Sequence, residues 1–187
     1  MKVLVACEFS GVVRDSFLAK GHDTISCDLL PTDSPGPHYQ GDIFDIINEG
    51  FDLMIAHPPC TYLCNSGVCW LHIREGRWNQ MREGAEFFKK LLNADIPKIC
   101  VENPIMHKYA KEIIGVNQSQ VIQPYMFGHG EKKATCLWLK NLPLLKPTNI
   151  VEGRIQRLHL LPPSKDRAKL RSITYKGIAE AMADQWG

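Results

Sequence analysis

The sequence has no apolar run that approaches the roughly 20 residues needed to span a bilayer. Its first apolar stretch is short and ends at Glu8, too early for the hydrophobic region of a secretory signal. The seven cysteines are an odd number, which a closed set of disulfides does not give. We therefore expect no membrane partner and a reducing, cytoplasmic location.

The chain also lacks an excess of charge of one sign and any internal repeat. Its 22 basic and 20 acidic side chains leave a net charge of +2, so nucleic acid would have to be attracted by a local patch. The 44% apolar residues and the dispersed 14 glycines and 12 prolines exclude a disordered tail, collagen and a low-complexity linker. At 187 residues the chain fits one domain, 1–187, whose core needs no disulfide or metal.

Short apolar runs of the buried-strand type alternate with helical patterns along the chain. The expected strands are Val3–Cys7, Thr24–Leu30, 51–57 and 98–104, and the expected helices are 12–21, 76–94 and 175–186. Segments 120–128 and 135–142 predict a late antiparallel hairpin, whereas the three prolines of 31–40 exclude regular structure there. The alternation predicts an α/β fold with a mainly parallel sheet and helices on both faces.

Four separated motifs follow the expected strands. They are residues 8–11, Asp28, residues 58–60 and Glu102. Because ligands of such sheets bind in a crevice outside the carboxyl ends of the strands, we expect these motifs to gather around one site.

The first motif, EFSG at 8–11, lies between a strand and a helix. Gly11 would let the backbone approach a ligand and the helix would offer unpaired N–H groups, but a tight turn that requires glycine explains the motif equally well. Asp28 fits either an acceptor for both ribose hydroxyls or an exposed loop acid. Asp42 fits an acceptor for an adenine amino group or a helix N-cap, which we favour slightly.

A rigid Pro-Pro turn projects Cys60 from the end of the third apolar run, where a thiolate could attack a substrate. Buried packing is the ordinary role of a single cysteine. Cys64 and Cys69, with His57 or His72, also allow a zinc site. Their spacings are looser than those of structural zinc sites, so we expect no metal.

Glu102 ends the apolar run 98–104 and would lie beside the Cys60 loop if the two strands are neighbours. Burial would raise its pKa, so the carboxyl group could hold or protonate an amidine-like edge of a heterocycle. Capping the helix that follows is an equally good interpretation of Glu102 viewed alone.

Taken in order, FSG from Phe9, HPPC ending at Cys60 and VEN ending at Asn103 resemble the cytosine-5 DNA methyltransferase family, in a short phage or prophage form without a target recognition domain. The resemblance covers roughly Met1–Leu139. It implies a Rossmann-like class I methyltransferase fold that binds S-adenosylmethionine, in a bacterium or a phage-infected host cell.

The resemblance also implies residue roles. Cys60 would attack ring carbon 6 of cytosine while Glu102 hydrogen-bonds the ring nitrogen and the exocyclic amine, and carbon 5 would then take the methyl group. Lys133 stands in the motif that contacts the target base. The cofactor pocket would be lined by Phe9, Ser10, Gly11, Asp28, Asp42 and Pro58.

The chain departs from the family pattern in several places. Two valines follow FSG where the family usually has another glycine, and the last segment lacks the family's Gly-Asn pair. Glu131, Lys133 and Thr135 replace a Gln-x-Arg-x-Arg motif, and lysine cannot reproduce the planar fork of arginine. Thirty residues, Asn141–Leu170, stand in place of the recognition domain.

Segment 141–170 has six basic and two acidic side chains, a net charge of +4, and fits either a phosphate-binding surface or a solvated loop. Three functions stay open. The chain could methylate cytosine in DNA after base flipping, with a homodimer or a partner protein supplying target recognition. It could methylate a free cytosine nucleotide, or it could be a catalytically silent binding protein of methyltransferase type.

Overall fold

The computed structural model describes residues 1–187, apart from the side chain of His159. A seven-stranded sheet of order β3-β2-β1-β4-β5-β7-β6 crosses the molecule. Its strands are β1 (Lys2–Ala6), β2 (Asp23–Asp28), β3 (His38–Gln40), β4 (Leu53–Ala56), β5 (Lys98–Pro104), β6 (Gln120–Ile122) and β7 (Thr135–Lys140). β1 to β5 pair in parallel, and β7 runs antiparallel to β5 and β6. The predicted parallel sheet with a late antiparallel hairpin is confirmed.

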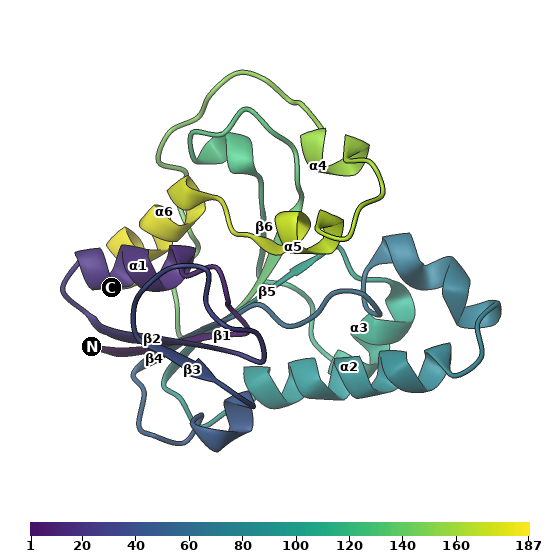
Figure 1. Cartoon of the computed structure of the whole chain (residues 1–187), viewed down its shortest axis with the longest axis horizontal. Helices are drawn as coiled ribbons and strands as arrows, with labels where there is room; N and C mark the ends of the chain where they lie inside the picture. The colour runs from purple at the N-terminus through teal and green to yellow at the C-terminus, as the bar shows by residue number, and fades with distance from the viewer.

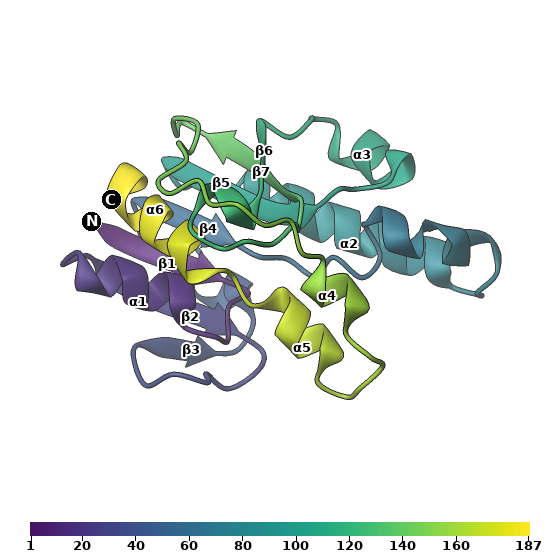
Figure 2. The same cartoon turned by 90° about the horizontal axis from the view of Figure 1, so that it is seen from above.

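Helices cover both faces of this sheet, as predicted. The α-helices are α1 (Val12–Ala19), α2 (Arg77–Leu92), α3 (Lys108–Ile114), α4 (Arg157–Leu160), α5 (Arg167–Ser172) and α6 (Lys176–Trp186). Three 3₁₀ helices are η1 (Ile43–Asp45), η2 (Asn65–His72) and η3 (Pro124–Met126). Figures 1 and 2 show α1 and α6 side by side on one face, with α2 and α3 on the other. The short helices α4 and α5 lie together at one end of the sheet (Figure 2).

Alternation along the central strands divides the core into two layers. Val3 and Val5 of β1 pack with α1 and α6, whereas Leu4 and Ala6 pack with α2 and α3. The second layer contains the face of α2 that the 3.6-residue periodicity predicts. A strand whose side chains are buried on both faces must be apolar throughout, which explains why these runs show no polar alternation.

The proline-rich loop differs from the prediction at its end. The short strand β3 follows Pro37 and pairs with β2 through Ser26 and His38. The prolines lie before the paired residues, so they remove no donor from the ladder. β2 itself ends at Asp28, because the Asp28 carboxylate accepts a hydrogen bond from the Leu30 N–H at 2.9 Å and turns the chain out of the sheet.

The strand order reverses around β1, which lies between β2 and β4. Connections from the carboxyl ends of β1 and β4 leave the sheet in opposite directions here, and such a point is where ligands bind in open α/β sheets. Within the part of the chain that the structure describes, no helix is long and apolar enough to cross a membrane.

Trp186 tests the core layer between the sheet and the helices α1 and α6. It is 2% exposed at the end of α6, packs in the layer that holds Val3 and Val5, and donates a hydrogen bond to the Pro143 carbonyl. Trp186→Ala should lower the free energy of unfolding by about 3–5 kcal/mol, because it leaves a large cavity. Urea unfolding measures this; Leu160→Ala, at a side chain 78% exposed, should change it by less than about 0.5 kcal/mol.

Candidate active site

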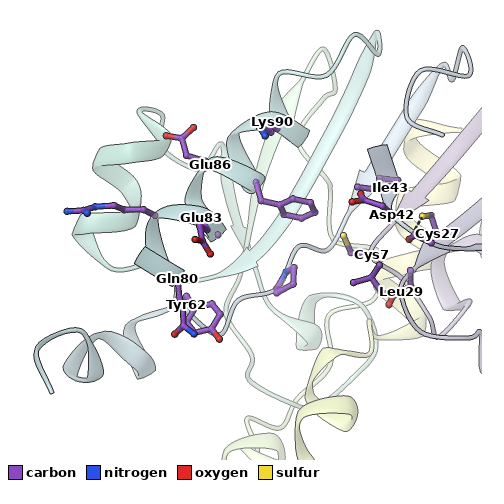
Figure 3. A pocket seen from close by; sticks show the side chains of 16 residues that line it. Cys7, Cys27, Leu29, Asp42, Ile43, Tyr62, Gln80, Glu83, Glu86 and Lys90 are labelled. Carbon is purple, nitrogen blue, oxygen red and sulfur yellow. Dashed lines mark hydrogen bonds between the residues drawn. The ribbon is translucent and has the colours of Figure 1, made fainter. Parts of the chain in front are cut away.

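A large cavity of about 870 Å³ opens between α2 and the carboxyl ends of β1 and β2. Figure 3 shows Gln80, Glu83, Glu86 and Lys90 of α2 on one side, and Cys7, Cys27, Leu29, Asp42 and Ile43 on the other. Asp28, Pro59, Tyr62 and Phe87 also line it. A cavity of this size and mixed lining can hold a ligand as large as a nucleoside derivative.

A second, smaller cavity of about 100 Å³ lies next to the first. Both are lined by Cys7 and Pro59, so the two cavities meet at these residues. The smaller one is also lined by Glu8, Phe9, Ser10, His57, Pro58, Cys60, Glu102, Pro104, Lys133 and the segment 171–174. The expected gathering of the strand-end motifs is therefore observed, with Asp28 in the larger cavity and Cys60 and Glu102 in the smaller.

The pairing of β4 with β5 brings the cysteine and the acid together. Ala56 is in register with Val101, so the residues that follow them, His57 and Glu102, lie side by side, although β5 continues to Pro104 in its pairing with β7. His57 Nδ1 lies 3.3 Å from Glu102 Oε2. Asn103 donates a hydrogen bond of 2.9 Å to the Pro58 carbonyl and so ties the end of β5 to the cysteine loop.

Glu102 does not cap a helix. The N-cap of α3 is His107, whose Nδ1 accepts from the Ala110 N–H. The expected rise in the pKa of Glu102 is also wrong. Burial does raise it, but the hydrogen bond from His57 and the positive charge of Lys133 outweigh burial, so the pKa lies below its usual value. The carboxyl group is ionised at neutral pH.

Cys60 and Cys64 form a pair of interacting thiols. The chain makes one helical turn between them, with the Cys64 N–H bonded to the Cys60 carbonyl at 3.1 Å. Donation from Cys60, together with Ser66 and the backbone N–H groups of Ser66 and Gly67, lowers the pKa of Cys64 to about 5. The interaction with Cys64 and burial raise the pKa of Cys60. The pKa values of the two thiols are thus displaced in opposite directions.

Lys133 projects into the smaller cavity from the connection between β6 and β7. Its ammonium group donates to the Arg171 carbonyl at 2.8 Å, and its backbone N–H donates to Gln123. Glu131, two residues earlier, turns away from the cavity and binds Arg157 and the Tyr175 hydroxyl. Of the three residues that stand at the positions of the Gln-x-Arg-x-Arg motif, Lys133 is the one whose charge acts on Glu102.

The segment 171–174, which includes the last two residues of α5, lines the smaller cavity and covers it. Lys169 of α5 pairs with Asp33 at 2.7 Å and lies over the Phe9 ring at 5.2 Å from its centre. Lys133 holds the covering segment through the Arg171 carbonyl. Of the basic stretch 141–170, Lys169 is thus held by an ion pair beside the site, and the residues that cover the cavity follow directly after that stretch.

The segment 8–11 is organised differently from the expectation. The Glu8 carboxylate accepts from the N–H groups of Val13 and Arg14, so the start of α1 offers these donors to its own chain and not to a ligand. Gly11 has φ 76° and packs against the Arg14 guanidinium. It lines neither of the two cavities, which favours the tight-turn interpretation, whereas Phe9 and Ser10 line the smaller one.

Asp28 and Asp42 lie in the larger cavity, together with backbone of Gly41 and the side chain of Ile43. Asp42 accepts from the Phe44 N–H at 3.0 Å and is the N-cap of η1, as favoured. Each carboxylate uses one oxygen, Oδ1, in its local turn. The second oxygen of each carboxylate is left for another partner.

Sequence reasoning missed the roles of His57, Cys64 and the cover at 171–174. His57 and Cys64 entered it as zinc ligands, but no group of three or more His, Cys, Asp or Glu among the described residues could hold a metal ion. A prediction of the register between β4 and β5 would have identified His57, because His57 follows Ala56 as Glu102 follows Val101. The cover follows from packing between distant segments, which local patterns do not encode.

Comparisons with known proteins find neither a family model nor a curated protein that matches this chain. Solved structures do match. A candidate DNA modification methyltransferase encoded within an Escherichia coli prophage aligns with 87% of this chain and 55% of its own, at 12% identity and a TM-score of 0.52. The methyltransferase EhMeth of Entamoeba histolytica aligns with 88% of this chain and 60% of its own, at 14% identity and 0.49.

The Dnmt2 methyltransferase of S. pombe aligns with 84% of this chain and 53% of its own, at 14% identity and 0.48. The chain thus spans a little more than half the length of the structures it matches. With the strand order and the antiparallel β7, the prophage match establishes a Rossmann-like methyltransferase fold.

The thiol pair predicts an unusual order of alkylation. Iodoacetamide reacts with thiolates, so the alkylation rate of Cys64 should reach half its maximum near pH 5, while Cys60 is alkylated slowly. Cys60→Ala removes the donor that most lowers the pKa of Cys64. The pH at which the alkylation rate of Cys64 is half its maximum should therefore move toward the ordinary thiol pKa of 9.0. Peptide mass spectrometry follows each site, and the rate at the exposed Cys69 should be unchanged by the substitution. An identical profile of Cys64 in both proteins would contradict the pairing.

Proposed function

We propose that the chain is an S-adenosylmethionine-dependent methyltransferase that methylates carbon 5 of cytosine in DNA through a covalent adduct with Cys60. The observation that carries the proposal is the joining of two cavities at Cys7 and Pro59. One has the size and acidic groups for a nucleoside cofactor, and the other places a cysteine, an acid and a lysine around a small space.

The larger cavity fits S-adenosylmethionine. Asp28 follows β2, and its second carboxylate oxygen suits the ribose hydroxyls, while Asp42 suits the adenine amino group. Apolar surface for the adenine ring comes from Ile43 and Phe87. The lining has more acidic than basic side chains, which favours a cationic ligand. The acidic residues are Asp28, Asp42, Glu83 and Glu86, and the basic residues are Arg82 and Lys90.

When bound, the cofactor would supply a methyl group activated by a sulfonium charge. Phe9, Ser10 and Pro58 line the neighbouring cavity, so their contribution would be to the reacting end of the cofactor and not to its nucleoside. Gly11 would act indirectly, by allowing the turn that leads into α1.

The smaller cavity suits attack on a pyrimidine. Cys60 would form a bond to ring carbon 6 as its proton passes to the Cys64 thiolate, its hydrogen-bond partner. Glu102 would hold the ring nitrogen and the exocyclic amine. Lys133, near Glu102, would hold the ring carbonyl oxygen and favour the negative charge that attack places on the ring. Carbon 5 then becomes the nucleophile that takes the methyl group.

The size and cover of the catalytic cavity support a second candidate substrate, a free cytosine nucleotide. The 171–174 segment covers a space of about 100 Å³, into which a base of duplex DNA would enter only after it is flipped and the cover has moved. The basic side chains around α5 support DNA instead, since phosphates would lie next to the opening.

Methyl transfer from labelled cofactor to duplex DNA, single-stranded DNA and dCMP tests both substrates. Cys60→Ser should reduce transfer more than about 10³-fold because it removes the nucleophile, and Glu102→Gln should reduce it about 10²- to 10⁴-fold because the amide cannot transfer a proton. DNA activity that falls steeply with salt supports DNA, and turnover of dCMP supports the nucleotide. If the cofactor binds but none of the three substrates is labelled, the chain is not a cytosine methyltransferase.

Cofactor binding can be measured without turnover. Asp28→Asn keeps the shape of the side chain but removes its charge, and it should weaken S-adenosylmethionine binding about tenfold, the loss of about 1.4 kcal/mol expected for a charge-assisted hydrogen bond. Isothermal titration calorimetry gives the affinity. Asp95→Asn, at an exposed site before β5 and therefore at the other end of the sheet, is the matched control and should bind as the wild type does. Equal affinities for all three proteins would place the cofactor elsewhere.

A further inference from the structure

His57 has no role in the chemistry assigned so far, although it lines the catalytic cavity together with Cys60 and Glu102. Its backbone N–H donates to the Ala6 carbonyl, which extends the ladder between β4 and β1 by one residue. Two prolines follow it. The backbone of His57 is therefore fixed by the sheet on one side and by the Pro-Pro turn on the other.

The two ring nitrogens of His57 have different surroundings. Nδ1 lies 3.3 Å from Glu102 Oε2, whereas Nε2 is buried and has no hydrogen-bond partner among the described residues. The side chains of His57 and Glu102 are only 9% and 17% exposed. The Nε2 atom therefore stays without a hydrogen-bond partner until a ligand enters the cavity.

The proposed reaction needs a proton that Glu102 does not hold. Attack at carbon 6 is assisted when the ring nitrogen is protonated, but the positive groups around Glu102 keep its carboxyl group ionised. Another group must therefore supply this proton, and it must be in contact with the carboxylate. Histidine takes up and releases protons near neutral pH, and His57 is hydrogen-bonded to Glu102.

We propose that His57 takes up a proton from water when the substrate binds and passes it through Glu102 to the ring nitrogen of the target base. This inference rests on the proposed function. A substrate acceptor pairs with Nε2–H, which completes the imidazolium. The proton on Nδ1 then moves to the Glu102 carboxylate, and from the carboxyl group to the ring nitrogen, as the Cys60 sulfur bonds to carbon 6.

The proton returns by the same path. After the methyl group is attached, carbon 5 loses its hydrogen to water, the electron pair restores the 5,6 double bond, and the Cys60–carbon 6 bond breaks to release the thiolate. The ring nitrogen gives its proton back to Glu102 and His57. His57 is therefore unchanged over one turnover, and no oxidant or further reactant is required.

Other titratable groups lie near His57 and Glu102, and their charges contribute to any pH profile of the reaction. Lys133 approaches from the β6–β7 connection, and its charge acts on Glu102. The thiols Cys60, Cys100 and Cys136 are coupled to the Glu102 charge, and Glu8 and Arg171 line the same cavity. The side chain of His57 is hydrogen-bonded to Glu102 and to none of these groups, so a substitution of His57 tests the pair itself.

His57→Gln is the decisive variant, because glutamine can donate a hydrogen bond to Glu102 but cannot hold a mobile proton. Its rate of methyl transfer in a single turnover should fall about 10²-fold at pH 8. The deficit should shrink as the pH is lowered, since solvent then protonates Glu102 directly. A deficit that is the same at every pH means that His57 acts only through structure, and it overturns the proposal.

A second measurement does not need activity. Carboxyl-labelled glutamate followed by NMR should show Glu102 titrating at higher pH in His57→Leu than in the wild type, since the hydrogen bond from His57 that lowers its pKa is lost. His107→Gln, at a buried histidine that caps α3, should leave this titration unchanged. An unchanged Glu102 titration in His57→Leu overturns the proposal. A shifted titration in a protein that labels no substrate refutes the proposed function and leaves the His57–Glu102 coupling standing.

Discussion

The in-register pairing of β4 with β5 is the constraint on which the site depends. Because Ala56 is paired with Val101, the two strands deliver a histidine and a glutamate to the same point, and the Asn103 hydrogen bond to Pro58 fixes the cysteine loop above them. A slip of one residue would turn the side chains of one strand to the opposite face of the sheet. The apolar side chains packed on both faces of β4 and β5 oppose such a slip. The packing of the core therefore also fixes the relative positions of His57 and Glu102.

Charge distribution around the site follows from the same geometry. Positive groups surround Glu102, while the Glu8 carboxylate, which could have competed for them, is used by the start of α1. Negative charge is concentrated instead in the larger cavity and on the thiol pair. The two halves of the site thus differ in electrostatic character, which suits a cationic donor on one side and a base that accepts protons on the other.

Sequence reasoning reached the fold and the position of the cysteine and the acid because both depend on local signals. Buried strands and the stripe on α2 are visible as periodic apolar residues, and Pro58 and Pro104 mark where strands end. It failed where the site depends on contacts between segments that are distant in the sequence. The pKa of Glu102 depends on a histidine 45 positions away, and Lys169 reaches Asp33 across 136 positions to hold the cover. No pattern within a short window contains these contacts.

The two ends of the chain meet in one layer of the core. Val3 and Val5 are buried among Ala179, Met182 and Trp186, and α1 packs along α6. During synthesis the first strand is made long before α6, so part of one face of the sheet stays uncovered until α6 has left the ribosome. Such long sequence separations slow folding and lengthen the exposure of apolar strands. A chaperone that shields this face during synthesis would keep the nascent chain from pairing with its neighbours.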